Sequence, residues 1–279
     1  MKNPLSHLSN LWQRIIVGFL GIGLFAGLIY LGFMGYMILF GLILGLSLFE
    51  FYGLSPYGMP KGLKETAALA GMVLAWSVLE GISDLNFQGF FLFVILWLFM
   101  LVWMVLAQWE KPFEKLSWMA MGWIYLIPCW ICMSLMAIGD FQDLRLVVLG
   151  LFALLWAADS GAYFAGRKWG KTKLFEKVSP KKSWEGLAGG LVLSMLTAYG
   201  FWNLAGHYPI TLWLILAAST TIFGTLGDLA ESTLKRSLDL KDSGNLLPGH
   251  GGILDRFDGF FLAAPVNYLI VVSYYHFFN

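Results

Sequence analysis

The chain has 279 residues, of which 58% are hydrophobic and only 13% are charged, and its mean hydropathy is +0.71. A soluble globular domain is excluded, because so apolar a chain with 13 Trp and 23 Phe has too little polar surface. The formal net charge of +1 favours no class of charged partner, so the information lies in where the charges are placed.

The hydropathy pattern predicts an all-α, polytopic integral membrane protein with about nine transmembrane helices. A helix needs about 20 mostly apolar residues to cross a bilayer. The apolar segments are too long and too uniform for the strands of a membrane barrel. In chain order the expected spans are 12–30, 33–50, 66–83, 88–107, 117–138, 144–165, 185–204, 210–230 and 257–277.

The basic residues indicate how these spans are oriented. Nine spans place successive connections on alternate sides, and 17 of the 18 Lys and Arg residues then fall on one side, with Arg145 the exception. By the positive-inside rule that side is the cytoplasm, so we expect a cytoplasmic N-terminus and an external C-terminus. The expected location is the cell (inner) membrane, with the active site facing the cytoplasm.

Two regions of different character are expected. Residues 1–140 predict a transmembrane scaffold, because they hold five apolar spans with short polar connections. Glu50 and Glu80 fall at predicted ends of spans, where solvated carboxylates are expected. Residues 141–279 predict the catalytic region, with large cytoplasmic connections at 166–184 and 231–256.

The first polar segment of the catalytic region begins at Asp159. This acid lies within or near the end of an apolar span, and isolated acids in spans are rare and often functional. Arg167 follows just beyond the membrane border and is a candidate for holding phosphate. Anchoring at the membrane surface is the simpler explanation for the lysines that come next.

The second segment reads Ser179-Pro180-Lys181-Lys182. Ser followed by Pro is typical of a helix start, so we expect Ser179 to cap a helix whose first turn contains Pro180. A helix N-terminus attracts anions, and Lys181 and Lys182 would strengthen such a site. Snorkelling lysines on a capped helix are the structural alternative, but they would oppose the helix dipole. A bound phosphate would explain them.

The densest group of charges occupies residues 228–259, between two apolar spans. If the eighth span continues as a helix to residue 236, the polar side chains there recur at helical spacing and share one face. These side chains are Asp228, Glu231, Ser232, Lys235 and Arg236.

The second half of this segment contains a glycine-rich turn around His250, whose glycines allow a ligand close to the backbone. Asp255 and Asp258 follow at i, i+3 spacing, on one face of the ninth helix. The helix dipole alone favours acids there, which is the structural alternative. Because carboxylates suit a divalent cation and Lys and Arg suit phosphate, residues 228–259 predict metal-assisted phosphoryl chemistry at a membrane surface.

These motifs resemble the phosphatidate cytidylyltransferase family, also called CDP-diacylglycerol synthase. The resemblance covers roughly residues 155–279. The motifs that carry it are Asp159-Ser-Gly-Ala-Tyr163, Gly166-Arg167, Ser179-Pro-Lys-Lys182, Glu185-Gly186, Ser232-Thr-Leu-Lys235-Arg236, Lys241-Asp242, Pro248-Gly-His250-Gly-Gly252 and Asp255-Arg256-Phe-Asp258.

The resemblance implies the reaction of CTP with phosphatidate to give CDP-diacylglycerol and pyrophosphate. It implies Mg²⁺ as the cofactor, held by Asp228, Asp255 and Asp258, and K⁺ as a second cation. The expected partners are CTP, phosphatidate and the lipid bilayer, with a second copy of the chain as a homodimer and no nucleic acid.

Such a reaction needs no strong general base, because the attacking phosphate oxygen is already an anion. It needs charge neutralisation on two polyanions, which metal ions and basic side chains provide. Lys182 is expected to take part in catalysis as well as binding, and His250 to contact phosphate or shape its loop. The expected substrate-binding residues are Arg167, Lys181, Lys182, Ser232, Lys235, Arg236, His250 and Arg256.

Three other functions remain open. A cation-coupled transporter would place acids toward the middle of the bilayer and show an internal repeat. A polyprenol kinase or a cytidylyltransferase for another lipid would tolerate the same charged cluster. A structural scaffold would leave that cluster without a purpose.

Overall fold

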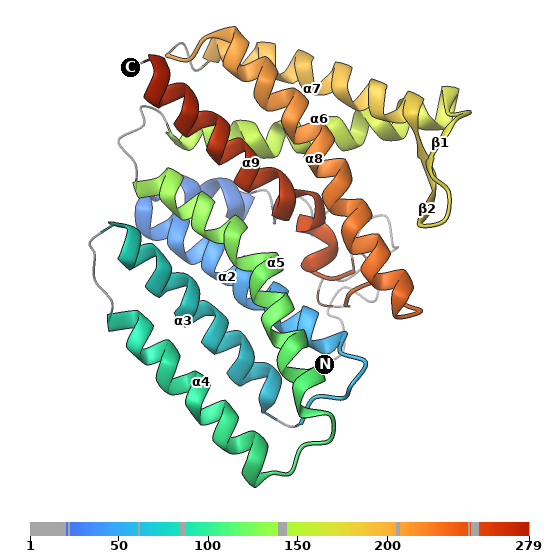
Figure 1. Ribbon diagram of the computed structural model, residues 1–279. Helices are drawn as coiled ribbons and strands as arrows, with labels where there is room; N and C mark the ends of the chain where they lie inside the picture. Colours follow the sequence, from blue (N-terminus) through green and yellow to red (C-terminus); the bar gives the residue numbers. More distant parts are fainter. Residues whose placement is uncertain are drawn as a thin grey trace, which may run out of the picture. The chain divides into compact units, whose positions relative to one another are not determined.

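A computed structural model of the chain describes residues 21, 23–60, 62–83, 88–138, 144–204, 207–244, 246 and 251–278. Within these ranges the chain is largely helical and carries a two-stranded sheet (Figure 1). The elements are α2 (Phe33–Gly53), α3 (Leu63–Ser83), α4 (Gln88–Leu106), α5 (Pro112–Ile138), α6 (Leu144–Trp169), β1 (Lys173–Phe175), β2 (Ser179–Ser183), α7 (Trp184–Leu204), α8 (Ile210–Ser237) and α9 (Leu254–Phe278).

All eight helices from α2 to α9 are long and apolar enough to cross a membrane. Each lies at one of the predicted spans from 33–50 onward, so the all-α, multi-pass fold class is confirmed. Helices suit this environment because they satisfy every backbone hydrogen bond internally, where lipid offers none. The remaining predicted span, 12–30, lies mostly outside the described residues, and the total of nine stays a prediction.

The helices group into two compact units. The first contains Met1–Leu135 together with Asp242–Arg256, and the second contains Met136–Lys241 together with Phe257–Asn279. Residues 242–244 and 251–256 therefore pack with the N-terminal helices, although they are far from them in the sequence.

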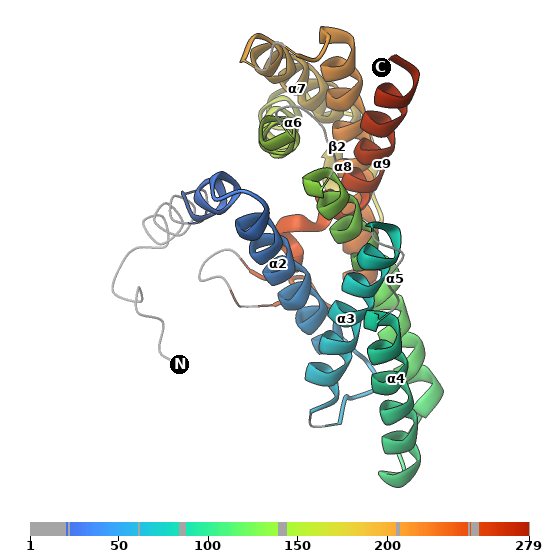
Figure 2. The ribbon, with the colours of Figure 1, turned by 90° about the vertical axis from the view of Figure 1, so that its left-hand side faces the viewer.

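In the first unit, α2 packs on α3 and α3 on α4 (Figure 2). Two tryptophans of α5 join it to these helices through hydrogen bonds to backbone carbonyls. The indole Nε1 of Trp118 donates to the carbonyl oxygen of Phe51 at 3.1 Å, and that of Trp123 donates to Ala67 at 3.1 Å. The ring of Trp118 also stacks on Phe51. These aromatic side chains bury apolar area and satisfy their polar atom at the same time.

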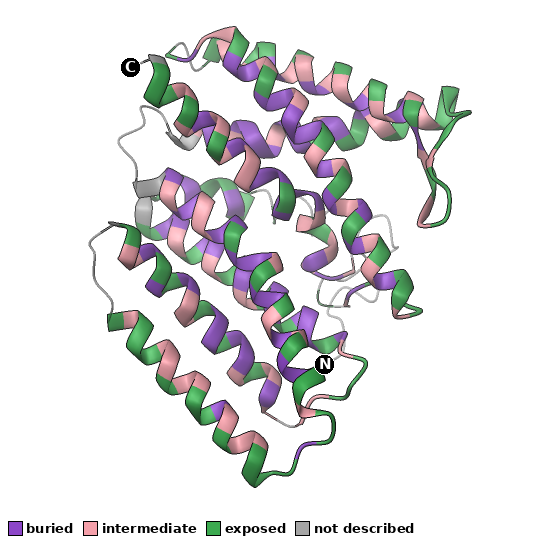
Figure 3. Ribbon diagram, in the orientation of Figure 1, coloured by how far each residue is buried: buried purple, intermediate pink, exposed green. Residues whose placement is uncertain are grey.

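Helix α4 is exposed or half-buried along nearly its whole length, as the green and pink colours along it in Figure 3 indicate. Met100 is its buried residue. An exterior this apolar requires lipid or another apolar surface around it.

The second unit depends on close contact between α6 and α7. Glycines make this possible: a Cβ atom at Gly161 would lie 2.5 Å from the carbonyl oxygen of Gly189. At Gly190 it would lie 2.6 Å from the carbonyl oxygen of Ala158. Small residues at helix contacts are typical of membrane proteins, where dispersion forces replace the hydrophobic effect.

The structure corrects the predicted start of α7. Ser179 and Pro180 belong to strand β2, which pairs with β1 in an antiparallel hairpin. The helix begins at Trp184 and is capped by Ser183, whose Oγ accepts a hydrogen bond from the backbone N–H of Gly186 at 3.1 Å. Serine is a good capping residue at either position. Because Ser179 is part of the hairpin, Ser183 is the one that caps the helix.

We predict that Gly190→Leu destabilises the second unit, because the new side chain would collide with the backbone of α6. Overpacking of this kind typically costs about 1–3 kcal/mol. Gly200→Leu is the matched control on the same helix, since a Cβ atom there meets nothing within 4 Å. Thermal unfolding of the detergent-purified variants measures the difference. Equal melting temperatures for both would contradict the close packing of α6 and α7.

Candidate active site

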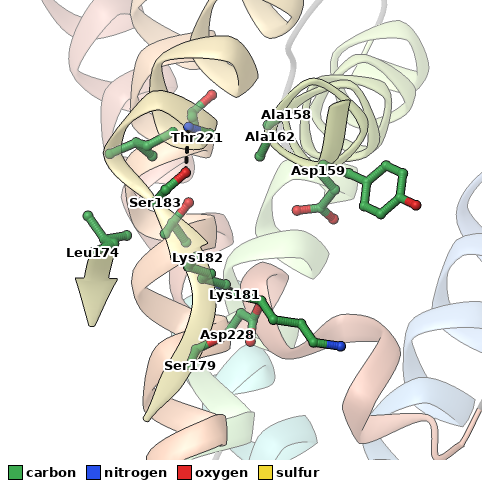
Figure 4. A pocket seen from close by; sticks show the side chains of 14 residues that line it. Ala158, Asp159, Ala162, Leu174, Ser179, Lys181, Lys182, Ser183, Thr221 and Asp228 are labelled. Carbon is green, nitrogen blue, oxygen red and sulfur yellow. Dashed lines mark hydrogen bonds and ion pairs between the residues drawn. The ribbon is translucent and has the colours of Figure 1, made fainter. Parts of the chain in front are cut away.

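A cavity of about 360 Å³ lies in the second unit, where α6, the hairpin, α7 and α8 meet (Figure 4). Acidic, basic and hydroxyl side chains line it alongside apolar ones. Its polar lining residues are Asp159, Tyr163, Ser179, Lys181, Lys182, Ser183, Thr221, Thr225 and Asp228. The structure thus brings Lys181, Lys182 and Asp228, which are distant in sequence, to one cavity.

Asp228 connects the hairpin to α8. Its Oδ2 lies 2.5 Å from the Nζ of Lys182, and both side chains are partly exposed, 35% and 25% respectively. Its Oδ1 accepts a hydrogen bond from the Oγ of Ser232 at 3.1 Å. As predicted, α8 continues through residue 236, so Asp228 and Ser232 share a face one turn apart.

Asp258 reaches the same region because α8 and α9 approach each other at glycines. A Cβ atom at Gly227 would lie 2.6 Å from the carbonyl oxygen of Asp258, and one at Gly259 would lie 2.8 Å from that of Gly224. The carboxyl group of Asp258 interacts electrostatically with Asp228. Its other charged neighbours are Asp159 and Lys235.

The hairpin is held against the start of α7 by Glu185. Its carboxylate accepts hydrogen bonds from the backbone N–H groups of Thr172 at 3.1 Å and Lys171 at 3.2 Å. The N–H of Trp184 donates to the carbonyl oxygen of Thr172 at 3.0 Å. These bonds place Lys181 and Lys182 on the strand just before the helix, rather than in the first helical turn that we expected.

The other predicted basic residues of the second unit have partners four residues away in the sequence. Lys235 is buried, and its Nζ lies 3.1 Å from the Oε1 of Glu231, which is fully buried. Arg236 donates to the carbonyl oxygen of Leu240 at 2.9 Å, which closes the end of α8. Arg167 donates to the hydroxyl group of Tyr163 at 3.2 Å, and Tyr163 lines the cavity.

Asp255 and Arg256 belong to the first unit. Asp255 accepts hydrogen bonds from the backbone N–H groups of Ser243 and Gly252, each at 3.0 Å. Arg256 is exposed in the first turn of α9. His250 lies outside the described residues, so its predicted role is untested.

Glu50 is not the solvated carboxylate that we expected at the end of a span. It is only 8% exposed, and its Oε2 accepts a hydrogen bond from the backbone N–H of Leu254 at 2.9 Å. Glu50 and Leu254 are 204 residues apart in the sequence. The residues around Glu50 therefore indicated only that a helix ends there, and not that its carboxylate has a distant partner.

The carboxylates of the second unit fit a magnesium ion. Mg²⁺ takes one or two protein carboxylates and completes its coordination with phosphate oxygens and water. Asp228 and Asp258 repel one another, so a cation beside them lowers the energy of the charged pair. Among the described residues no group of three His, Cys, Asp or Glu side chains is placed to hold a metal ion, and the three-carboxylate set of Asp228, Asp255 and Asp258 stays a prediction.

Two cavity residues that we did not predict are Thr221 and Thr225. They precede Asp228 on α8 at i−7 and i−3, so all three lie on one face of the helix. Extending the helical spacing of the charged residues upstream would have identified them.

Comparison with known proteins points to one family. The model described as "Cytidylyltransferase family" matches residues 12–274. A Bacillus subtilis protein named phosphatidate cytidylyltransferase is 34% identical over 276 residues, which cover 94% of this chain and 98% of the relative. A protein of the same name from Brucella suis is 34% identical over 272 residues, covering 94% of this chain and 93% of the relative.

A third relative of that name, from Haemophilus influenzae, is 48% identical over 137 residues, or 47% of this chain and 46% of the relative. The family match and the long alignments span nearly the whole chain, and the cavity brings basic and acidic groups together. The chain is therefore a membrane-embedded nucleotidyltransferase that belongs to the cytidylyltransferase family.

Proposed function

We propose that this enzyme is a phosphatidate cytidylyltransferase, which transfers CMP from CTP to phosphatidate and releases pyrophosphate. The observation that carries the proposal is the cavity in which Lys181 and Lys182 meet Asp228. The names of the relatives supply the substrates, and the basic and acidic groups of the cavity suit two phosphate-bearing molecules and a cation.

In this reaction a phosphate oxygen of phosphatidate attacks the α-phosphorus of CTP. A new P–O bond forms while the bond from the α-phosphorus to the bridging oxygen of the β-phosphate breaks, and pyrophosphate leaves with the electron pair. The chain's task is to hold two polyanions together and to neutralise the charge that grows on the leaving group.

Lys182 suits that task because its partner can change. Its Nζ is paired with Asp228 in the structure, and both groups are partly exposed. A phosphate oxygen entering the cavity can take over the ammonium group, which frees the Asp228 carboxylate for a cation. Lys181, exposed on the same strand, provides a second positive charge for the same phosphates.

Asp228 and Asp258 are the residues that we propose to hold Mg²⁺. The ion would supply Lewis-acid polarisation of the phosphates that it contacts. Ser232 orients Asp228 through its hydrogen bond, and Lys235 offsets the negative charge around Asp258. Asp255 as a third ligand and K⁺ as a second cation remain predictions from the family resemblance.

We propose that the cavity faces the cytoplasm, in the cell (inner) membrane, where CTP is available. The support is the distribution of basic residues, which places the hairpin and the end of α8 on the positively charged side. A homodimer is likewise proposed from the resemblance, and the exposed apolar surface of α4 is compatible with either lipid or a second copy.

The reaction is tested with purified protein in detergent, radiolabelled CTP and phosphatidate. We expect a lipid-soluble labelled product with Mg²⁺ and none with EDTA, because the charges of the phosphates need a cation. Addition of K⁺ tests the second cation. A folded protein that labels no phosphatidate under any of these conditions would refute the proposal and favour another lipid acceptor or a transporter.

Asp228→Asn and Asp258→Asn should each lower kcat by about 100-fold or more, because a neutral amide is a poor ligand for Mg²⁺. Asp239→Asn is the matched control: Asp239 is exposed, with a positive φ of 56° that Asn tolerates well. Asp255→Asn, measured beside them, tests the third predicted ligand. Wild-type turnover in Asp228→Asn and Asp258→Asn would rule out the metal assignment.

Lys182→Ala should lower kcat/KM for CTP by about 10-fold to 100-fold, the usual worth of a hydrogen bond to a charged group. Lys177→Ala, which changes an exposed lysine in the turn of the same hairpin, should have little effect. If Lys182→Ala lowered only the melting temperature, the pair with Asp228 would be structural and the phosphate role would be wrong.

A further inference from the structure

Glu50 is a buried carboxylate in the last turn of α2, in the unit that the sequence indicated as scaffold. Its neighbours Phe51 and Tyr52 are 1% and 0% exposed, so Glu50 lies on a buried part of the helix end. Burying a carboxylate is expensive unless its oxygens are hydrogen-bonded. The Oε1 of Glu50 is buried and has no hydrogen-bond partner in the part of the chain that the structure describes. Stability alone therefore does not explain a carboxylate here.

The other oxygen, Oε2, accepts the hydrogen bond from the backbone N–H of Leu254, the first residue of α9. The first N–H groups of a helix have no partner within the helix, so a carboxylate is favoured at this position. This bond joins α2 to the start of α9 across 204 residues of sequence.

Two glycines of the charged segment lie directly against the same carboxylate. A Cβ atom at Gly244 would be 2.8 Å from the Oε1 of Glu50, and its three nearest neighbours would all be atoms of Glu50. A Cβ atom at Gly252 would be 2.5 Å from the Oε2 of Glu50 and equally close to the Oγ of Ser243. The absence of side chains at these two glycines is thus what allows the segment to fit over Glu50.

Asp255 holds the segment from its other side. By accepting the N–H groups of Ser243 and Gly252, it ties the two arms of the segment to the first turn of α9. The segment and Asp255 form one hydrogen-bonded group, and Glu50 is the residue that attaches this group to α2. All of these residues lie within the first unit.

We infer that Glu50 is a positioning residue: it positions residues 242–244 and 251–254, up to the first residue of α9, and therefore acts on the reaction through Asp255. The expected effect of Glu50 on catalysis rests on the proposed function. The contact of Glu50 with Gly244, Gly252 and Leu254 does not, because it is read from the geometry alone.

The test compares Glu50→Ala and Glu50→Gln with Glu65→Ala, which removes an exposed carboxylate from the first turn of α3 in the same unit. Glu50→Ala should lower kcat by about 10-fold to 100-fold, the cost of misplacing a catalytic group, with little change in KM for CTP. Glu50→Gln should restore most of the activity, because its amide oxygen can still accept the N–H of Leu254. Glu65→Ala should behave as wild type.

A second readout does not depend on activity. Lys241 is exposed just before the segment, so limited trypsin digestion followed by mass spectrometry reports how firmly the segment is held. We expect faster cleavage after Lys241 in Glu50→Ala than in Glu50→Gln, Glu65→Ala or wild type. If wild-type protein transferred no CMP to phosphatidate, the proposed function would fail, and this digestion would still decide whether Glu50 holds the segment.

A double-mutant cycle with Gly244→Ala tests the contact directly. Gly244→Ala alone should speed cleavage after Lys241, because its methyl group collides with Glu50. In the Glu50→Ala background the same change should have little further effect, since the colliding atoms are gone. Additive effects, or a Glu50→Ala variant with wild-type kcat and wild-type digestion, would overturn the inference. A lower melting temperature with unchanged kcat would overturn the positioning role.

Discussion

The close approach of helices at glycines is the constraint on which the second unit depends. In a bilayer the space between helices is not closed by the hydrophobic effect, so packing relies on surfaces that fit without protruding side chains. Gly161 and Gly190 bring α6 and α7 together, and Gly227 and Gly259 do the same for α8 and α9. The second contact also places Asp258 within electrostatic range of Asp228. The contact between α8 and α9 therefore both packs the two helices and brings the two acids close together.

The ion pair of the cavity joins two partly exposed side chains, Lys182 and Asp228. A partly exposed ion pair such as Lys182 with Asp228 contributes little to the stability of a fold. In the proposed reaction, a phosphate would replace Asp228 as the partner of Lys182, and a cation would replace Lys182 as the partner of Asp228. Lys235 differs, because it is buried against Glu231 and close enough to Asp258 to influence its charge. Its place favours a role in balancing charge around the acids.

The first unit supplies more than a hydrophobic frame. Residues 242–244 and 251–256 pack with the N-terminal helices, and Gly244 and Gly252 lie against the carboxylate of Glu50. A buried acid contributes poorly to stability, yet it is well suited to fixing a glycine-rich backbone, because it accepts N–H groups that a helix start leaves unpaired. The N-terminal half thereby takes part in shaping the region that the family resemblance associates with chemistry.

The sequence alone determined the membrane class, the spans from α2 to α9 and the family, because long apolar runs and ordered polar motifs are local signals. It also indicated the helical face that carries Asp228 and Ser232, since helical spacing can be read along the chain. Only the tertiary structure decided which of two serines begins α7, because the hairpin bonds of Glu185 select Ser183. It likewise decided the place of Glu50, whose partner Leu254 is 204 residues away. Such a long-range contact produces no repeating pattern of residues in the sequence, because it depends on how separate helices pack.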